Sequence, residues 1–386
     1  MKKIFYIEYV DKNELIGVIN KVNAQCNEFS KYYETILLYL DENDICINNF
    51  NKMKFKRIKN VLGRKKLKSN TILKKINNRI KIIKFNLYIK KILLEEKPEI
   101  IYVRKYEILN GIRILKNFKK KNNAHIIYEI PTYPYEQEYL KNGKKIMRLL
   151  NKKLDKGMEK IAELIPVVLG QDVEFTCKKY LPISNGIDIK NINIKNINKV
   201  KGNIIDLIGV ANVSFWHGYD RLIEGLKNYY TIERKNKVIF HIVGDGDEIN
   251  NLKQLTKKYK LNDYVLFHGI KNGKELDEIM DYCEIGIGSI ANHRKGLKKD
   301  SALKNREYCA RGIPFVVASE DDAFKDFKYI YKISPDETSV NINNLLDFYN
   351  NIKNEDYINE MREYAENNLT WEVIMKPIVN AINTNI

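Results

Sequence analysis

The sequence predicts an α/β protein made of two Rossmann-like, doubly wound domains, and two observations support this fold class. Apolar segments of strand length alternate with longer helical patterns through both halves of the chain, which is typical of parallel sheets with crossover helices. A composition shift also divides the 386 residues, because the turn at residues 182–188 is followed by a stretch rich in Asn, Lys and Ile that extends to Lys201. Since so long a chain exceeds one hydrophobic core, we interpret that stretch as a linker between two domains.

Each expected element is an apolar run or a helical pattern between turn signals. In the first half, strands are expected at residues 3–9, 35–40, 100–104, 125–130 and 164–169, and helices at 110–121 and 136–159. In the second half, strands are expected at 204–210, 238–243, 264–267, 285–288, 315–318 and 329–333. Helices are expected there at 219–228, 248–259, 273–282, 302–311, 340–350, 355–367 and 371–382. Ligands bind such sheets beyond the carboxyl ends of the strands, so the loops at those ends are candidate sites.

The composition excludes several classes of protein. Hydrophobic residues make up 44% of the chain, which is ordinary for a globular protein. Apolar runs all fall short of the roughly 18 residues that a transmembrane helix needs, and the N-terminus is charged too early for a signal peptide. The five cysteines are odd in number and form no CxxC pair, and the histidines lack metal-ligand spacing. We therefore expect a cytoplasmic protein with reduced thiols, no disulfide framework and no metal site.

Positive charge is concentrated in one segment. The net charge is +18, and residues 51–94 contain 16 Lys and Arg residues and no Asp or Glu. Apolar residues are interleaved with these cations, which suits an anionic membrane surface. The phosphate backbone of a nucleic acid would also suit the charge, but no nucleic-acid motif accompanies it, so no nucleic-acid partner is expected. A solvated Lys-rich face remains the alternative.

The expected helix 302–311 has features of a phosphate site. Gly312 and Pro314 end it, and Ser301 is a candidate N-cap. A helix N-terminus at the carboxyl edge of a parallel sheet attracts phosphate, so Ala302 and Leu303 are expected at the ligand. Lys304 and Glu307 lie one turn apart on one face, where a cation and a carboxylate suit a nucleotide-sugar. An ordinary amphipathic helix with a solvated Lys/Glu face explains the same residues.

Three further loops are expected at the same sheet edge. Asn212 and His217 follow the strand 204–210, the turn Gly244-Asp245-Gly246 follows 238–243, and His268 follows 264–267. A glycine turn allows close backbone approach to a ligand, although any strand-to-helix loop can contain two glycines. A single histidine is usually a surface or core residue, but its place in such a loop favours ligand contact. The convergence of these loops predicts a nucleotide site.

In the first half, Glu129 stands at a strand end before a loop with two prolines. Thr132, Tyr133 and Tyr135 follow it, and aromatic rings with carboxylates suit a sugar acceptor. A rigid structural loop is the alternative. Gly17, after the first strand, would let a helix N-terminus approach the donor, and a tight packing contact explains this glycine almost as well.

At these residues the chain resembles the two-Rossmann glycosyltransferases called GT-B, and is similar to family 4 (group 1). The resemblance rests on Ser184-Asn185-Gly186-Ile187-Asp188, on Gly244-Asp245-Gly246, and on the segment from Glu307 to Ala318. It implies an acceptor domain at 1–185, a nucleotide-sugar donor domain at 186–368, a cleft between them, and a terminal helix at 369–386 that packs back on the first domain. By the resemblance, Glu307 holds the donor ribose hydroxyls.

The sequence departs from the family pattern at the diphosphate. The first Glu of the family's E-x7-E motif falls at Lys299, and the family's usual Arg and Lys fall at Asn212 and His217. Lys304, Lys299 or His217 could supply the missing positive charge. We assign Glu129, His217 and Lys304 as catalytic candidates. The donor-binding candidates are Gly17, Asn212, Gly244, Asp245, Gly246, His268, Ser301, Ala302, Leu303 and Glu307, and the acceptor-binding candidates are Thr132, Tyr133 and Tyr135.

The resemblance implies a retaining, metal-independent transferase without a cofactor, whose donor substrate is a nucleotide-sugar. Its acceptor would be a saccharide or a lipid-linked saccharide of a capsule, O-antigen or exopolysaccharide. Residues 51–94 would hold the protein on the inner face of the cell membrane as a peripheral protein. Two alternatives stay open, a GT-B-shaped nucleotide-sugar epimerase and an inactive homologue that only binds. No clear acid–base set supports the epimerase, and the missing carboxylate at Lys299 keeps the inactive homologue open.

Overall fold

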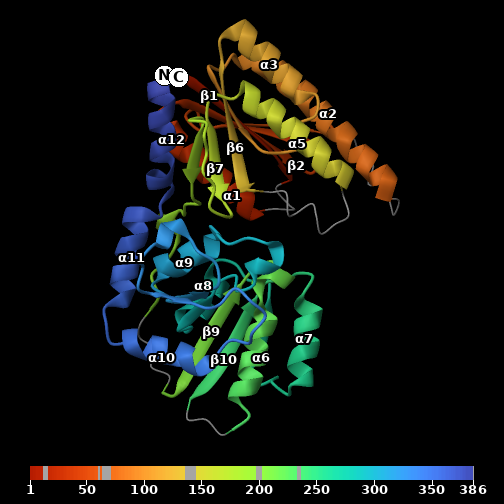
Figure 1. Cartoon of the computed structure of the whole chain (residues 1–386). Coiled ribbons are helices and arrows are strands. Elements are labelled where there is room, and N and C mark those ends of the chain that lie inside the picture. The colour runs from red at the N-terminus through yellow and green to blue at the C-terminus, as the bar shows by residue number, and fades with distance from the viewer. Residues whose placement is uncertain are drawn as a thin grey trace. The chain divides into compact units, whose positions relative to one another are not determined.

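The computed structural model describes residues 1–11, 16–59, 61–62, 71–134, 145–196, 202–232 and 236–385. The chain divides into two compact units (Figure 1). Unit 1 comprises Met1–Val168, Val173–Ile183 and Trp371–Ile386, and unit 2 comprises Leu169–Asp172 and Ser184–Thr370. Each unit is an α/β sandwich around its own sheet, which confirms the predicted fold class.

The sheet of unit 1 has the strand order β4-β3-β2-β1-β5-β6-β7-β8. The described pairs β2–β1, β1–β5, β5–β6 and β7–β8 run parallel. At one edge, β3 pairs antiparallel with β2, and β4 pairs antiparallel with β3. The strands are β1 (Lys3–Asp11), β2 (Glu34–Asp41), β3 (Asp44–Asn49), β4 (Lys54–Ile58), β5 (Ile100–Arg104), β6 (His125–Tyr133), β7 (Ile165–Leu169) and β8 (Tyr180–Ile183). The predicted strands are therefore present, and β3, β4 and β8 are additions.

Helices cover both faces of this sheet. On one face α1 (Ile16–Ser30) packs beside α12 (Trp371–Asn385), and their apolar residues share one core with β1 and β5. The second layer consists of α2 (Thr71–Glu96), α3 (Gly111–Asn122) and α5 (Lys145–Ile161), which contact one another in that order (Figure 1). None of the helices in the described ranges is long and apolar enough to cross a bilayer.

The sheet of unit 2 has the order β11-β10-β9-β12-β13-β14, and all neighbours run parallel. Counted from β9, this is the 3-2-1-4-5-6 order of a Rossmann domain. The strands are β9 (Ile204–Val210), β10 (Lys237–Val243), β11 (Val265–Gly269), β12 (Ile285–Ile287), β13 (Phe315–Val317) and β14 (Ile330–Lys332). Each of them overlaps a predicted strand.

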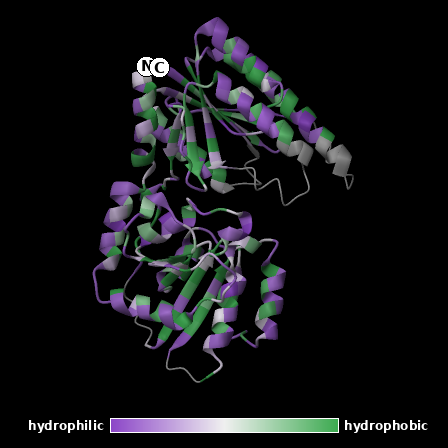
Figure 2. Ribbon diagram, in the orientation of Figure 1, coloured by the Kyte–Doolittle hydropathy of each residue, from purple (hydrophilic) through white to green (hydrophobic). Residues whose placement is uncertain are grey.

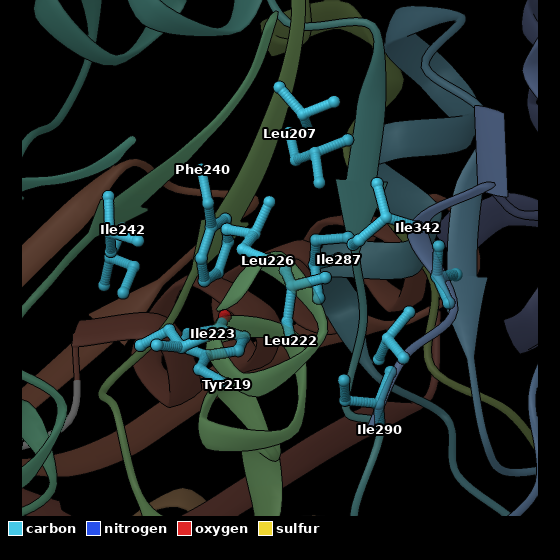
Figure 3. Close-up of a cluster of buried hydrophobic side chains, with 14 of the residues drawn as sticks. Leu207, Tyr219, Leu222, Ile223, Leu226, Phe240, Ile242, Ile287, Ile290 and Ile342 are labelled. Carbon is cyan, nitrogen blue, oxygen red and sulfur yellow. The ribbon is translucent and has the colours of Figure 1, made fainter. Parts of the chain in front are cut away.

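Two cores lie on the two faces of this second sheet. One is built mainly by α6 (Tyr219–Tyr229), α7 (Ile249–Lys258) and α10 (Ile342–Ile352), whose aliphatic side chains interdigitate with those of the strands (Figure 3). The other is built by α8 (Lys274–Asp281), α9 (Leu303–Arg311) and α11 (Tyr357–Asn368). Burial of both apolar faces fixes the register of the sheet and therefore the positions of the loops at its carboxyl edge.

Candidate functional site

The topology of unit 2 indicates where a ligand would bind. The strand order reverses between β9 and β12, and open parallel sheets bind ligands beyond the carboxyl ends of the strands at such a point. Residues 211–218 follow β9, and residues 288–302 follow β12 and lead into α9. The candidate site is therefore built from these two segments and the first turns of α9.

The glycine turn after β10 supports the loop that follows β9. Gly244 and Gly246 have φ values of +123° and +153°, which side chains rarely adopt. A Cβ atom on Gly244 would lie 1.8 Å from the Ala211 carbonyl oxygen, and one on Gly246 would lie 2.2 Å from that of Val213. The Val213 amide also donates to the Asp245 carbonyl at 2.6 Å. The close approach that these glycines permit is thus to a neighbouring backbone, and their contact with a donor stays a prediction.

His217 is neutral, which corrects the expectation that it could serve as a cation. The Ser214 backbone N–H donates to His217 Nδ1 at 2.9 Å. The same nitrogen also lies 3.2 Å from the Ser214 carbonyl oxygen, and we assign the tautomer with the proton on Nε2, in which Nδ1 accepts from the Ser214 amide. Burial, with the nearby cations Lys304 and Lys295, lowers the pKa of His217 to about 2. His217 can therefore offer a ligand one neutral N–H donor rather than a positive charge.

Lys304 is a lysine for which the described residues provide no ion-pair partner. It lies in the first turn of α9, partly buried, with Nζ 3.5 Å from the hydroxyl of Tyr219 and 5.4 Å from the centre of that ring. Burial lowers the pKa of Lys304 to about 7, and the charge of Asp300 partly opposes this shift. Among the described residues, no carboxylate forms an ion pair with Lys304. A desolvated ammonium of this kind is stabilised by an anionic ligand.

The N-terminus of α9 is uncapped, so the prediction that Ser301 caps it is wrong. Ala302 occupies the N-cap position with extended backbone, and no side chain accepts a hydrogen bond there. The Ser301 hydroxyl instead accepts the backbone N–H of Asn185 at 2.8 Å, and Asn185 Nδ2 donates to the Ser301 carbonyl at 2.6 Å. Within the described chain, the amides of Leu303 and Lys304 find no protein acceptor. Amides without acceptors at a helix N-terminus favour an anionic ligand there.

Glu307 lies one turn after Lys304 on α9. Arg311 holds one carboxylate oxygen, Oε1, through Nε at 3.2 Å and Nη2 at 3.0 Å. The side chain of Glu307 is 29% exposed, and Oε2 has no hydrogen bond from the described residues. Arg311 therefore orients Glu307 and leaves one oxygen available for a hydroxyl ligand.

Lys299 is already neutralised, which removes it from the candidates for the missing charge. Its Nζ lies 2.6 Å from a carboxylate oxygen of Asp172 and 2.6 Å from one of Asp322. Burial opposes the charged form, but these two carboxylates raise the pKa of Lys299 overall. Lys299 is a structural cation at the position where the family pattern has a carboxylate.

The remaining donor-binding candidates of unit 2 are Asn212 and His268, and they differ in exposure and in hydrogen bonding. Asn212 is exposed on the loop after β9. His268 lies with Nε2 2.9 Å from Nδ1 of His241, whose own Nε2 lies 2.9 Å from Asp206. Burial lowers the pKa of His268. This Asp206–His241–His268 chain, in which Asp206 and His241 are buried, was missed from the sequence, because its members come from three different strands and have no characteristic spacing.

In unit 1, Glu129 is fully buried and fully bonded. Lys21 Nζ at 3.1 Å and Arg104 Nε at 3.3 Å donate to Oε1, whereas Gln25 Nε2 at 3.1 Å and the Tyr102 hydroxyl at 2.6 Å donate to Oε2. Burial by itself would raise the pKa of Glu129, but the two cations and the hydroxyl outweigh it and lower the pKa to about 2. Glu129 is therefore a permanently ionised centre of unit 1 with no free acceptor position, which argues against the catalytic role expected for it.

The other candidates of unit 1 lie near the surface. Gly17 is exposed, and an added Cβ would meet nothing within 4 Å, so tight packing does not explain this glycine. The Thr132 hydroxyl donates a hydrogen bond to the Pro131 carbonyl oxygen at 2.8 Å. The ring centroid of Tyr133 lies 5.5 Å from that of Phe175. Tyr135 lies outside the described residues.

Comparison with known proteins agrees with the resemblance seen in the sequence. Residues 190–328 match the family model described as Glycosyl transferases group 1. Sucrose-phosphate synthase from Thermosynechococcus elongatus has a similar structure, with a TM-score of 0.66 and 13% identity over 99% of this chain and 98% of that chain. No curated protein matches the chain by sequence.

Two further solved structures share the fold and are complexes with nucleotides. The catalytic domain of starch synthase IV from Arabidopsis thaliana, bound to ADP and acarbose, has a TM-score of 0.65 and 10% identity over 99% of this chain and 98% of that chain. Anabaena HepE in complex with UDP and glucose has a TM-score of 0.63 and 12% identity over the full length of both chains. At such low identities these likenesses show the fold alone.

Proposed function

Because the chain has the GT-B fold and is similar to group 1 glycosyltransferases over residues 190–328, we propose that it transfers a sugar from a nucleotide-sugar whose diphosphate is bound by Lys304. The observation that carries this proposal is the partly buried Lys304 ammonium at the carboxyl edge of the unit 2 sheet, for which no ion pair occurs in the described part of the chain. The neutral N–H of His217 and the two free amides of α9 add donors without adding charge. A diphosphate would satisfy all of these groups at once.

The chemistry of sugar transfer explains why such donors would be useful. The bond between the sugar C1 and the β-phosphate oxygen breaks, and its electron pair stays with the departing nucleoside diphosphate. Negative charge on the phosphate therefore grows in the transition state, where fixed donors and a cation stabilise it more than they stabilise the ground state. Glu307, held by Arg311, would accept hydrogen bonds from the ribose hydroxyls and fix the position of the donor.

The acceptor and the setting are also part of the proposal. We assign the acceptor as a saccharide or lipid-linked saccharide of a surface polysaccharide, bound by unit 1 near Thr132 and Tyr133. Transfer would retain the anomeric configuration and need no metal or other cofactor. The reaction would take place in the cytoplasm, and residues 51–94 would dock the enzyme on the anionic inner face of the membrane.

The structure modifies the basis of that docking. Lys52 pairs with Glu34, and Arg57 pairs with Asp41 and Asp44, so part of the positive charge is neutralised within unit 1. The segment is also not one amphipathic element, because its described parts include the edge strand β4 and most of α2. The support for docking therefore rests mainly on α2, and Lys65, Lys66 and Lys68 lie outside the described residues.

The proposal is tested with purified full-length protein and a panel of UDP-, ADP- and GDP-sugars. We expect slow hydrolysis of one donor, and we expect Lys304→Met to weaken its binding by about 1.5–3 kcal/mol, which is the usual contribution of a charge-assisted hydrogen bond. Binding of the uncharged nucleoside should not change. Lys299→Met is the matched control, since this neighbouring lysine is already paired, and it should leave affinity for the diphosphate intact.

The same measurements separate the two alternatives. Donor binding without hydrolysis or transfer to any acceptor would support a homologue that only binds, as the absent carboxylate at Lys299 would allow. Conversion of one nucleotide-sugar to its epimer would support an epimerase. Equal affinity of wild type and Lys304→Met for the diphosphate would contradict the proposed site.

A further inference from the structure

The helix α2 has an apolar stripe on its exposed side. The aliphatic residues of this stripe are 40–54% exposed and recur at steps of three, four and seven, which places them on one face of a helix. They are Ile76, Ile80, Ile83, Leu87 and Leu94. The stripe extends over about 27 Å at 1.5 Å per residue. Figure 2 shows hydrophobic residues along α2 in alternation with hydrophilic ones.

The core of unit 1 does not account for this stripe. The opposite face of α2 packs inward through Ile82, Phe85, Ile89 and Leu93, all of which are buried. The helix therefore has two apolar faces, one used by the fold and one turned to solvent. Exposed aliphatic rows of this length are uncommon on soluble proteins and mark a surface that binds something.

Basic residues lie along both sides of the stripe. Lys84 and Lys91 lie on one side, and Arg79 and Lys90 lie on the other, as their positions at 100° per residue require. Arg79 donates to Glu107, and Lys91 lies 3.9 Å from Glu95, whereas no ion pair of Lys84 or Lys90 occurs among the described residues.

The neighbouring helices extend this positive charge. Basic residues recur along α3, which has no acidic residue at all, and α3 contacts both α2 and α5. Lys119 of α3 pairs with Glu163, so part of this charge is neutralised, and the cations beside the stripe itself are those of α2.

We propose that this stripe of α2 is the face that inserts into an anionic lipid bilayer. This inference deepens the proposed membrane docking and rests on it. A helix with apolar residues flanked by cations lies in the plane of the interface, with its aliphatic side chains among the acyl chains and its lysines at the headgroups. Lys84 and Lys90 would extend to the phosphates on opposite sides, while their methylene stems stay in the apolar layer.

A second copy of the chain is the competing occupant, since steps of three and four also suit helix pairing. Charge argues against it. Two copies of α2 would bring rows of cations against each other, including Lys90 at the edge of the stripe between Leu87 and Leu94. Like charges at such positions destabilise a pair, whereas anionic lipid neutralises them.

The test is flotation of the full-length protein with phosphatidylcholine vesicles, with and without phosphatidylglycerol. Wild type should bind the anionic vesicles, and its binding should weaken as salt is raised because the Debye length shrinks from about 10 Å at 0.1 M to about 3 Å at 1 M. The variant Ile83→Gln/Leu87→Gln should bind at least about tenfold less, since it removes apolar insertion. The matched control is Ile270→Gln in unit 2, where an isoleucine is 68% exposed, and it should bind as wild type does.

A second pair of variants isolates the charge. Lys84→Gln/Lys90→Gln should lose the preference for phosphatidylglycerol, while Lys274→Gln, an exposed lysine of unit 2, should keep it. Light scattering in solution tests for a second copy bound at the stripe. We expect no dimer of the wild type that the variant Ile83→Gln/Leu87→Gln would dissociate. Such a dimer would overturn the inference in favour of a second copy.

The outcomes distinguish this inference from the function on which it rests. Unchanged vesicle binding of Ile83→Gln/Leu87→Gln overturns the role of the stripe and leaves docking through other residues of 51–94 intact. Failure of wild type to bind anionic vesicles overturns both docking proposals. Hydrolysis of the donor in solution depends on neither, so the transferase proposal is judged separately.

Discussion

Glu129 in unit 1 and Lys304 in unit 2 are both charged groups removed from water, but their surroundings differ in one respect. Glu129 receives hydrogen bonds from four side chains, two of them cationic, and none of its surface is exposed. Lys304 lies beside the hydroxyl and ring of Tyr219 and near His217, and no ion pair of its ammonium occurs among the described residues. The first charge is compensated by the protein, and the second is not.

This difference distinguishes a structural charge from a binding site. A buried charge with all its partners stabilises one arrangement of the chain, and removing it leaves those partners uncompensated. A partly buried charge without a partner costs folding free energy until a ligand of opposite sign arrives. From residue type and position in a loop, both appeared equally suited to catalysis, and only the set of partners separates them.

The largest effect is expected for Glu129→Gln. It leaves Lys21 and Arg104 buried with one carboxylate fewer, so unit 1 should lose about 3–5 kcal/mol of unfolding free energy. Each unit contains one tryptophan, Trp371 in unit 1 and Trp216 in unit 2, so Trp216→Phe lets urea unfolding of unit 1 be followed by fluorescence. Donor affinity at unit 2 should not change while the protein remains folded.

The control for this experiment is a carboxylate of unit 1 in an exposed pair. Glu95 lies 3.9 Å from Lys91 at the surface, and Glu95→Gln should cost less than about 1 kcal/mol. If Glu129→Gln kept wild-type stability and lost sugar transfer, the comparison would be reversed and Glu129 would be a catalytic residue.

Glu307→Gln is expected to have the next largest effect, and on binding rather than folding. Arg311 would lose one of its carboxylate partners but keep its 2.7 Å ion pair with Asp277, so α9 should remain in place. Loss of a charge-assisted hydrogen bond to a ribose hydroxyl should weaken nucleoside diphosphate binding by about 1.5–3 kcal/mol. Calorimetry compares the affinity of wild type and variant for the ribonucleotide and for the 2′-deoxyribonucleotide. If Glu307→Gln weakened the binding of both nucleotides equally, Glu307 would not contact the 2′-hydroxyl.

A smaller effect is expected from the titration of Lys304. Its pKa is about 7 in the folded chain and 10.5 ordinarily, so the unfolded state binds more protons between these values and stability should rise with pH across that range. Lys304→Met removes the cost of the buried charge, so it should stabilise unit 2 at pH 7, and this gain should decline as the pH rises from 7 towards 10.5.

Ligand binding provides an independent measure of the same group. Above pH 7, binding of a nucleotide-sugar should draw about one proton onto Lys304, because a diphosphate favours the ammonium form. Calorimetry in buffers of different ionisation enthalpy detects this uptake. Its persistence in Lys304→Met would show that another group takes the proton, and Lys304 would then not be the cation on the diphosphate.

The sequence predicted the strands closely but missed an edge of the sheet. Both β5 and β9 have the expected bounds, because each is an apolar run between turn signals. By contrast, β4 consists of mostly exposed residues, Lys54–Ile58, whose pattern is that of a solvated surface. Pairing with β3, rather than burial, makes it a strand, and pairing leaves no periodic signal in the segment itself.

The candidate site was predicted in part, for a related reason. Local patterns located the first turn of α9 and the face that Lys304 and Glu307 share. The charge state of His217 was not predictable, because it depends on burial and on Lys304, which lies far away in the sequence. The same applies to Glu129, whose partner Lys21 lies 108 residues away. Electrostatic surroundings made by distant segments are what the sequence does not display.

The smallest effect is expected for His217, and it bears most directly on the charge at the site. Since burial lowers the pKa of His217 to about 2, the imidazole stays neutral and contributes only an Nε2 hydrogen bond of about 0.5–1.5 kcal/mol. His217→Ala should therefore weaken donor binding by that amount at every pH from about 5 to 9, which spans the usual range of histidine titration. Any change of affinity near pH 7 should persist in His217→Ala and disappear in Lys304→Met, because the titrating group is the lysine. Nuclear magnetic resonance of the His217 ring provides the direct measurement, and a ring that protonates near pH 6.5 would restore His217 as the second cation on the diphosphate.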